Sequence, residues 1–241
     1  MPSINFNKYQ TRTHDYHWQQ IAKNLFTFNA YVQARYQQIV DQIPKSNNLK
    51  ILDIGCGDGV LLYLISQKNK SLLTGIDLDQ DSLKIATTKV KAKFIKASAY
   101  NLPVKSSSYD YVLASEIIEH LDQPKKMLIE IKRVLKPKGI AIITTPVKIF
   151  PKPEDSLHVQ EFTVKNLNQI LCQYFSQIKI IASHPFLLKK IYTFTLFKFG
   201  RYYFEPFKWL INLWVLLTSL NPFKLSFFKN SNQLVICSQP L

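Results

Sequence analysis

The chain has 241 residues, 46% of them hydrophobic, so it can bury the core of one large domain and is too apolar for global disorder. Its net charge of +15 favours phosphate-bearing partners such as nucleic acid, anionic lipid or a nucleotide-linked substrate, although a solvated lysine-rich surface would have the same excess. Three separated cysteines exclude a disulfide framework, and the polar N-terminus lacks a signal-peptide segment, so we expect a cytoplasmic protein.

Helix-like and strand-like segments alternate along most of the chain. Apolar residues recurring at three and four predict a helix over residues 18–42, and Pro44 ends it. Further helices are expected over residues 59–67, 81–89, 124–135 and 164–174. Seven apolar segments predict strands, at residues 50–55, 71–78, 92–98, 109–115, 140–146, 178–183 and 233–239.

This alternation predicts an α/β fold, a doubly wound seven-stranded sheet with helices on both faces. We expect four parts: an N-terminal helical segment or lid over residues 1–45, a core over 46–185, an apolar helical insertion over 186–229, and the last strand of the core over 230–241.

A glycine-rich turn follows the first predicted strand. In ILDIGCGDGVLL, residues 51–62, the glycines let the backbone turn tightly and approach a ligand, and the helix behind them offers free N–H groups. Asp53 precedes the turn, and Asp77 ends the next strand, where an open α/β sheet places a ribose-binding acid. A dinucleotide site would need a glycine at position 60, which is Val60.

The pattern D-x-G-x-G-x-G resembles the first motif of class I S-adenosylmethionine (SAM) dependent methyltransferases, and the likeness extends over about residues 50–146. It implies the seven-stranded, Rossmann-like methyltransferase sheet, with Asp53 and the turn at the methionine part of SAM and Asp77 at the ribose. The family often has Gly-Asp-Ala where this chain has Ala97, Ser98 and Ala99, so a neutral group replaces the acid expected at the adenine. The expected SAM-binding residues are Asp53, Gly55, Cys56, Gly57, Gly59, Asp77, Leu78, Ser98, Ala99 and Ser115.

Acids and histidines follow the fourth predicted strand, in EIIEHL at residues 116–121. Glu116, Glu119 and His120 are expected at the edge of the sheet that binds ligands, together with His158 from the loop after strand five. This pattern resembles small-RNA 2′-O-methyltransferases and ubiquinone-biosynthesis O-methyltransferases, which implies that these four residues bind Mg²⁺ or Mn²⁺, while histidines also admit Zn²⁺. Alternatively Glu116, Glu119 and His120 are catalytic without metal, with His120 as a general base, and His158 caps a helix.

Residues 186–229 are apolar, aromatic and basic, with a net charge of +6 from seven bases and one acid. The longest apolar run, of 12 residues, is too short to cross a bilayer, which takes about 20. Lys198, Arg201, Glu205, Lys208 and Asn212 recur at three and four, which predicts kinked amphipathic helices on an anionic membrane surface. A cap over the acceptor pocket and a dimer interface are the alternatives. Tyr16, His17 and Trp18 either form a lid over the cofactor or pack a helix onto the sheet.

The function predicted from these features is SAM-dependent O-methylation of a small-molecule, lipid-linked or glycan acceptor, by a cytoplasmic enzyme peripheral to the membrane. RNA 2′-O-methylation is the second hypothesis, supported by the charge and the acid–histidine cluster but by no RNA-binding module. A membrane-associated binding subunit that keeps the fold without chemistry is the third.

Overall fold

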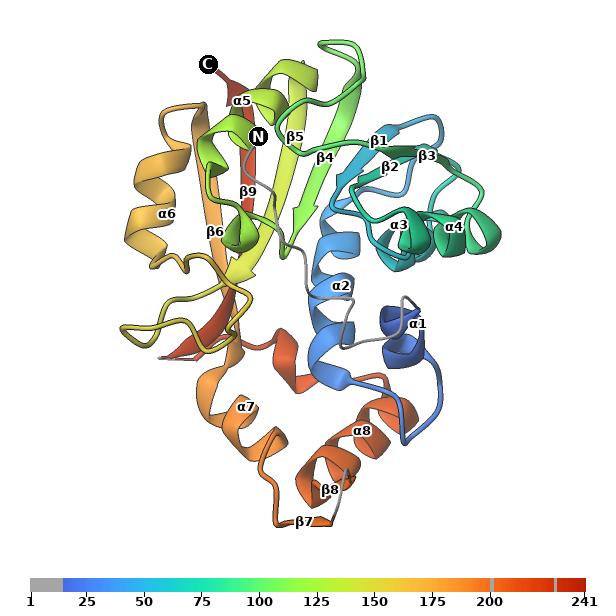
Figure 1. Ribbon diagram of the computed structural model, residues 1–241, viewed down its shortest axis with the longest axis vertical. Helices are drawn as coiled ribbons and strands as arrows, with labels where there is room; N and C mark the ends of the chain where they lie inside the picture. The colour runs from blue at the N-terminus through green and yellow to red at the C-terminus, as the bar shows by residue number, and fades with distance from the viewer. Residues whose placement is uncertain (1–14, 200–201, 228) are drawn as a thin grey trace.

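The computed structural model describes residues 15–199, 202–227 and 229–241, and Figure 1 shows its ribbon. One seven-stranded sheet runs through the molecule in the order β3-β2-β1-β4-β5-β9-β6. β9 alone is antiparallel to its neighbours β5 and β6, whereas the other pairs are parallel. The strands are β1 (Lys50–Ile54), β2 (Leu72–Asp77), β3 (Lys93–Lys96), β4 (Tyr109–Ser115), β5 (Leu135–Pro146), β6 (Phe175–Pro185) and β9 (Asn230–Pro240). The seven-stranded α/β prediction is confirmed.

Helices cover both faces because successive strand residues point to opposite sides. Leu52 packs in the core beneath α5 (Pro124–Val134) and α6 (Val164–Leu171). Its neighbour Ile51 packs in the other core, beneath α2 (Ala30–Gln42), α3 (Val60–Ser66) and α4 (Gln80–Lys89). Burial on both faces explains the nearly continuous apolar runs of the strands.

The single helix predicted over residues 18–42 is wrong, because two helices replace it: α1 (Tyr16–Ile21) and α2. The side chain of Asn29 accepts a hydrogen bond from Val32 N at 3.2 Å and caps the N-terminus of α2, so a new helix begins there. Asn24 accepts one from Phe26 N at 3.0 Å in the intervening turn. Local capping therefore overrides a periodicity that continues through the break.

The insertion between β6 and β9 forms the end of the molecule around α7 and α8 in Figure 1. Its elements are α7 (Phe186–Tyr192), the hairpin β7 (Phe197–Phe199) and β8 (Tyr202–Phe204), α8 (Pro206–Thr218) and the 3-10 helix η3 (Pro222–Lys224). Tyr192, Val215 and Phe223 share a small third core with Phe28 and Ala34 at the α2 end of the fold. The insertion is thus packed onto α2.

The polar stripe predicted for the insertion is wrong. Lys198 lies in the strand β7, and Glu205 precedes α8, so the positions do not share one helix. Asn212 is fully buried and accepts a hydrogen bond from Tyr192 Oη at 2.7 Å. Arg201 lies outside the described residues. Among the described helices, none combines the length and the apolarity that crossing a bilayer would require.

Candidate functional site

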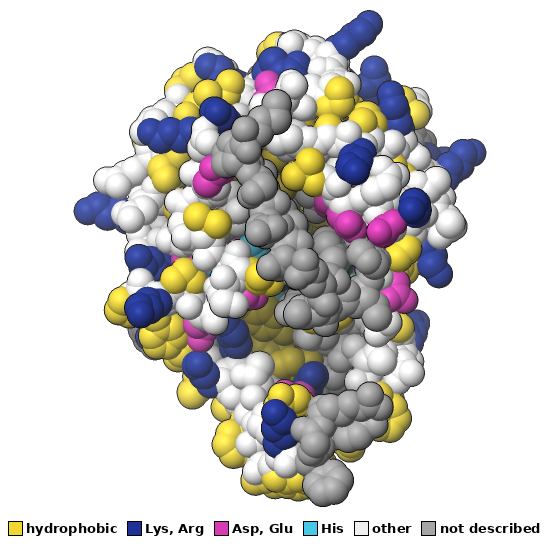
Figure 2. Space-filling model, viewed as in Figure 1, with side chains coloured by type: hydrophobic (Ala, Val, Ile, Leu, Met, Phe, Trp, Pro, Cys, Tyr) yellow, Lys and Arg dark blue, Asp and Glu magenta, His cyan; other side chains and the backbone are white. Residues whose placement is uncertain are grey.

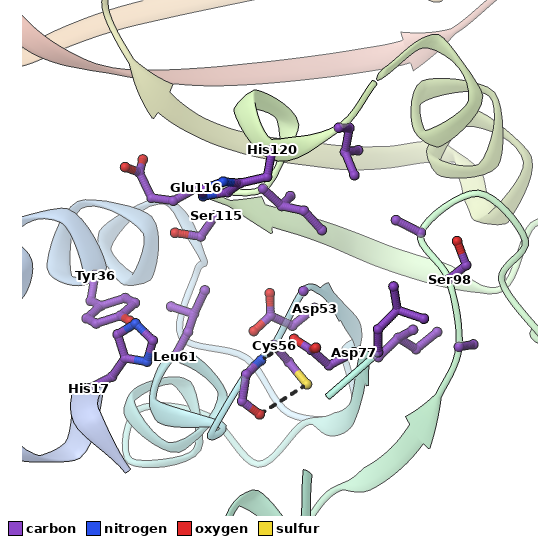
Figure 3. Close-up of a pocket in the computed structure, with 18 of the residues that line it drawn as sticks. His17, Tyr36, Asp53, Cys56, Leu61, Asp77, Ser98, Ser115, Glu116 and His120 are labelled. Carbon is purple, nitrogen blue, oxygen red and sulfur yellow. Dashed lines mark hydrogen bonds between the residues drawn. The ribbon is translucent and has the colours of Figure 1, made fainter. Parts of the chain in front are cut away.

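The first cavity lies where β1, β2 and β4 end, and Figure 3 shows the side chains that point into it. The space between its lining residues is about 880 Å³, which includes open solvent at its mouth. Nine of the ten residues predicted to bind SAM line it: Asp53, Gly55, Cys56, Gly57, Asp77, Leu78, Ser98, Ala99 and Ser115. The residues predicted from the sequence to bind SAM therefore lie together around one cavity.

The glycine turn has left-handed backbone at Gly55, Gly57 and Gly59, with φ of +72°, +50° and +82°. A Cβ on Gly55 would lie 2.6 Å from Ile117 Cδ1, so the turn leaves no room for a side chain there. Gly59 is the predicted residue that does not line the cavity. A Cβ on it would lie 2.9 Å from Ala86 Cβ, so its place is in the packing of the turn against α4.

Two carboxyl groups face this cavity, the buried Asp53 and the half-buried Asp77. Asp77 Oδ2 accepts a hydrogen bond from Gly57 N at 2.8 Å, and its Oδ1 accepts one from Asp79 N at 2.9 Å, so the second strand holds the turn in place. Burial raises the pKa of Asp77 despite these bonds, which act in the opposite direction. Burial, and then the charge of Asp77, raise the pKa of Asp53 well above its usual range. A cationic ligand group would offset the electrostatic repulsion between the two carboxylates.

α1 is fastened to the glycine turn through Asp58. The Asp58 carboxylate accepts hydrogen bonds from His17 N at 3.1 Å and lies 3.2 Å from His17 Nδ1, while Trp18 Nε1 donates to Asp58 O at 2.8 Å. His17 lines the cavity, whereas Trp18 packs on Tyr63 with ring centroids 4.9 Å apart. α1 therefore lines the cavity through His17 and packs on α3 through Trp18.

Glu116 directly follows β4 and has a φ of +52°, a backbone strain worth about 1–3 kcal/mol at a non-glycine residue. Its Oε2 accepts a hydrogen bond from Arg35 Nη1 at 3.0 Å, and its Oε1 accepts one from Asn232 Nδ2 at 3.1 Å. Burial raises the pKa of Glu116, but Arg35 and Asn232 outweigh it and the net pKa is lowered. The buried Arg35 Nε has no hydrogen-bond partner among the described residues.

Glu119, His120 and His158 form the acid–histidine cluster, with one potential ligand atom from each within 4.8 Å of the others. His120 Nδ1 lies 3.0 Å from Leu157 O, and His158 Nδ1 lies 2.9 Å from Glu161 Oε1. Glu119 is fully buried and its Oε2 accepts a hydrogen bond from Thr145 Oγ1 at 3.0 Å. Histidines oriented through Nδ1 in this way are typical of metal ligands, which bind through the other nitrogen.

The structure does not bring Glu116 into this cluster, contrary to the four-residue ligand set expected from the sequence. The physical reason is its two hydrogen bonds, which turn both carboxylate oxygens toward Arg35 and Asn232. His158, by contrast, meets His120 with ring centroids 5.0 Å apart, although 38 residues separate them in the chain.

A second cavity, of about 980 Å³ with part of it open to solvent, adjoins the first. His17, Arg35, Glu116 and His120 line both cavities, so they mark the passage between them. The acid–histidine cluster and residues from α7 and the loop after β5 line the second one. Five residues that line this region were not predicted from the sequence as site residues: Tyr31, Arg35, Glu154, Glu161 and Lys189.

Comparison with known proteins locates the conserved domain. Residues 52–143 match the family described as "Methyltransferase domain", which confirms the resemblance seen around the glycine turn. A ubiquinone biosynthesis O-methyltransferase of Leptothrix cholodnii is 32% identical over 119 residues, covering 46% of this chain and 50% of the relative. A ubiquinone/menaquinone biosynthesis C-methyltransferase of Campylobacter jejuni is 34% identical over 131 residues, covering 51% and 56%. The chain thus spans about half the length of these curated relatives.

The fold matches over a longer range than the sequence. The phosphoethanolamine N-methyltransferase 2 of Haemonchus contortus, solved with phosphomonomethylethanolamine and S-adenosylhomocysteine, aligns with a TM-score of 0.69 at 18% identity. The alignment covers 100% of this chain and 61% of that one. At this identity the match shows the fold alone, which is the Rossmann-like methyltransferase fold.

Proposed function

We propose that this protein is a SAM-dependent methyltransferase that methylates an oxygen of a lipid-linked or glycan acceptor at a membrane surface. The observation that carries the proposal is the pair of adjoining cavities. One is lined by the glycine turn and the two acids of a methyltransferase domain, and the other is lined by groups able to bind or deprotonate an acceptor.

The residues of the first cavity fit SAM. Asp53, Gly55 and Gly57 would hold its amino-acid part, Asp77 the ribose hydroxyls, and Leu78 with Ser98 and Ala99 the adenine, while Cys56 and Ser115 complete the lining. The raised pKa of Asp53 suits a site that gains an ammonium group on binding. Arg35 adds a buried cation with an unpartnered Nε, which suits a carboxylate. Bound SAM supplies an electrophilic methyl group.

The passage between the cavities supports an acceptor-side role for His120. Methyl transfer to oxygen requires an in-line approach and the loss of the acceptor's proton. His120 lines both cavities, and its contact with Leu157 O sets the orientation of the ring. The strained, ion-paired Glu116 flanks the same passage and would position the acceptor or Arg35.

Glu119, His120 and His158 would hold a divalent cation, which would lower the pKa of an acceptor hydroxyl and fix its place. Two imidazoles with one carboxylate favour Mn²⁺ or Zn²⁺ over Mg²⁺. With Glu116 turned away, three protein ligands would leave positions open for the acceptor.

A membrane surface as partner is supported by the exposed side of the insertion, where Figure 2 shows hydrophobic side chains with basic side chains beside them. On α8, Leu210, Trp214 and Leu217 are 62%, 54% and 77% exposed. Lys198 Nζ lies 4.9 Å from the ring centre of the exposed Tyr203. Aromatic and aliphatic side chains next to lysines suit an anionic lipid interface.

The experiment incubates purified protein with methyl-labelled SAM and separate lipid, glycan and RNA fractions of the host, with and without EDTA. We expect label in lipid or glycan, loss with EDTA and recovery with Mn²⁺ or Zn²⁺. Label confined to RNA would favour the 2′-O-methylation hypothesis, and indifference to EDTA would leave His120 as a base without metal. Calorimetry with S-adenosylhomocysteine tests the cofactor site separately, and absence of binding would overturn the enzyme proposal.

Membrane association is tested by co-sedimentation with vesicles of phosphatidylcholine, with and without 30% phosphatidylglycerol as the probe. We expect W214S/L217S to lose at least about tenfold in vesicle affinity, since both side chains would be buried on binding. The control I129S changes a side chain that is 52% exposed on α5, away from the insertion. If W214S/L217S instead lowers the oligomeric mass, the surface is a dimer interface.

A further inference from the structure

The second cavity is acidic, although the chain as a whole is basic. Five of the described residues that line it are acids: Glu116, Glu119, Glu154, Asp155 and Glu161. Two are bases, Arg35 and Lys189, so the lining has a net charge of 2 − 5 = −3 with histidines neutral, against +15 for the chain. A divalent cation bound at the acid–histidine cluster would change the net charge of the lining to −1. The interior therefore disfavours an anionic group both with and without the cation.

Both bases of the lining are already paired. Arg35 donates to Glu116 at 3.0 Å, and Lys189 Nζ donates to Glu154 Oε2 at 2.6 Å. The other three acids also have partners within the protein: Glu119 accepts from Thr145 Oγ1, Asp155 accepts from Leu157 N, and Glu161 lies 2.9 Å from His158 Nδ1. An ionised carboxylate can accept several hydrogen bonds, and the ring of Tyr31 lines the same cavity. Carboxylates that accept hydrogen bonds next to an aromatic wall suit a group rich in hydroxyl donors.

Two lysines stand at the rim of the same cavity. Phe150 lines the cavity and is 38% exposed, and its ring packs on Phe186 with centroids 5.9 Å apart. Lys190 Nζ lies 5.6 Å from the Phe150 ring centre and 5.3 Å from that of Phe186. Lys229 Nζ lies 5.9 Å and 4.7 Å from the same two rings. Among the described residues, Lys229 makes no ion pair, whereas Lys190 shares Glu154 with Lys189.

We infer that the acceptor has two parts: an uncharged, hydroxyl-bearing head that enters the second cavity, and an anionic group joined to it that stays at the rim beside Lys190 and Lys229. This inference rests on the proposed function, because it assigns the second cavity to the acceptor. The inference follows from the difference in charge between the acidic interior and the basic rim. A wholly neutral acceptor would not interact with the charge of the lysines, and a wholly anionic one would be repelled by the interior.

Four water-soluble probes separate the parts of such an acceptor. Glycerophosphoinositol combines a hydroxylated ring with a phosphodiester, myo-inositol has the ring alone, glycerol 3-phosphate has the phosphate alone, and glycerophosphoethanolamine replaces the ring by an amine. Calorimetry with protein saturated with S-adenosylhomocysteine measures each Kd, and binding of S-adenosylhomocysteine itself reports on the proposed function independently. We expect glycerophosphoinositol to bind at least about tenfold more tightly than each of the other three.

Charge variants assign the effect to the two regions. K190E/K229E is expected to remove the advantage of glycerophosphoinositol over myo-inositol and its dependence on salt, whereas the control K105E, an exposed lysine in the loop before β4, keeps both. D155N, which retains an acceptor for Leu157 N, is expected to strengthen binding of glycerol 3-phosphate. Equal binding of the ring alone or of the phosphate alone, tighter binding of the amine probe, or no binding of any probe would overturn the inference.

Discussion

Arg35 of α2 and Glu116, which directly follows β4, form a largely buried ion pair with 3.0 Å between Nη1 and Oε2, across 81 residues of sequence. Each side chain is 13% exposed, and both line the passage between the two cavities. Arg35 precedes the matched methyltransferase domain, residues 52–143, whereas Glu116 belongs to it. α2, which lies outside the matched domain, therefore supplies a charged group to the site.

Arg35→Met should destabilise the protein by about 3–5 kcal/mol, because it leaves the buried Glu116 carboxylate without its cation. The double variant R35M/E116Q should recover most of this loss, since the glutamine needs no counter-charge and can still accept from Asn232. Urea unfolding of the two variants measures the difference. Equal stability of R35M and wild type would show that the pair contributes nothing to folding.

Asp53→Asn should stabilise the ligand-free protein at neutral pH while weakening SAM binding. The pKa of Asp53 is raised in the folded state by burial and then by Asp77, so the folded protein retains a proton that the unfolded chain has released. The free energy of unfolding therefore decreases as pH rises above the pKa of Asp53 in the unfolded chain, about 3.9, and goes on decreasing up to its pKa in the folded protein. The neutral asparagine does not titrate and avoids this decrease. Thermal unfolding at pH 5 and pH 8 should show the larger gain at pH 8. D81N, at an exposed acid on α4, is the control. A D53N protein no more stable than wild type would contradict the burial argument.

His184 should make the fold sensitive to mild acid. Burial lowers its pKa to about 4, although the hydrogen bond to Tyr31 O acts in the opposite direction. The unfolded chain then binds a proton that the folded one does not, so stability should fall by about 3 kcal/mol as pH drops from 6.5 to 4. His184→Asn tolerates the φ of +61° and should flatten this part of the stability curve. Urea midpoints measured from pH 7 to pH 4 test it, and an unchanged slope in H184N would assign the acid sensitivity to other groups.

Asn212→Leu should loosen the insertion from α2. Asn212 is fully buried, donates to Phe28 O at 2.7 Å and accepts from Tyr192 Oη at 2.7 Å. The leucine leaves Phe28 O without this donor, at a cost of about 1–3 kcal/mol, and removes the shortest hydrogen bond of Tyr192 Oη, which keeps its contact with Asn29 Oδ1 at 3.3 Å. Limited proteolysis should cut N212L within residues 186–229 at least about tenfold faster than wild type, while the exposed-site control L213S is unchanged. Resistance of N212L would show that the apolar contacts alone hold the insertion.

The predicted residues that line the first cavity belong to a local sequence pattern. Asp53 and Asp77 lie at the carboxyl ends of β1 and β2, and parallel strands place such residues at the same edge of the sheet. Their positions in the sequence therefore sufficed to predict that both would line one cavity. Arg35 could not be found in this way, because its partner is set by how α2 packs on the sheet. The stripe in the insertion failed for a related reason, since a helical spacing was extended across a hairpin that reverses the chain.

The central place of β9 has a consequence for how the chain is synthesised. β9 lies between β5 and β6 and pairs with both, yet it is made after them and after residues 186–229. Until it emerges from the ribosome, the unpaired edge of β5 and the whole of β6 lack a partner, and exposed edges of this kind invite pairing between chains. The nascent protein is therefore most prone to aggregate in the interval after β6 and the apolar insertion have left the ribosome and before β9 has done so.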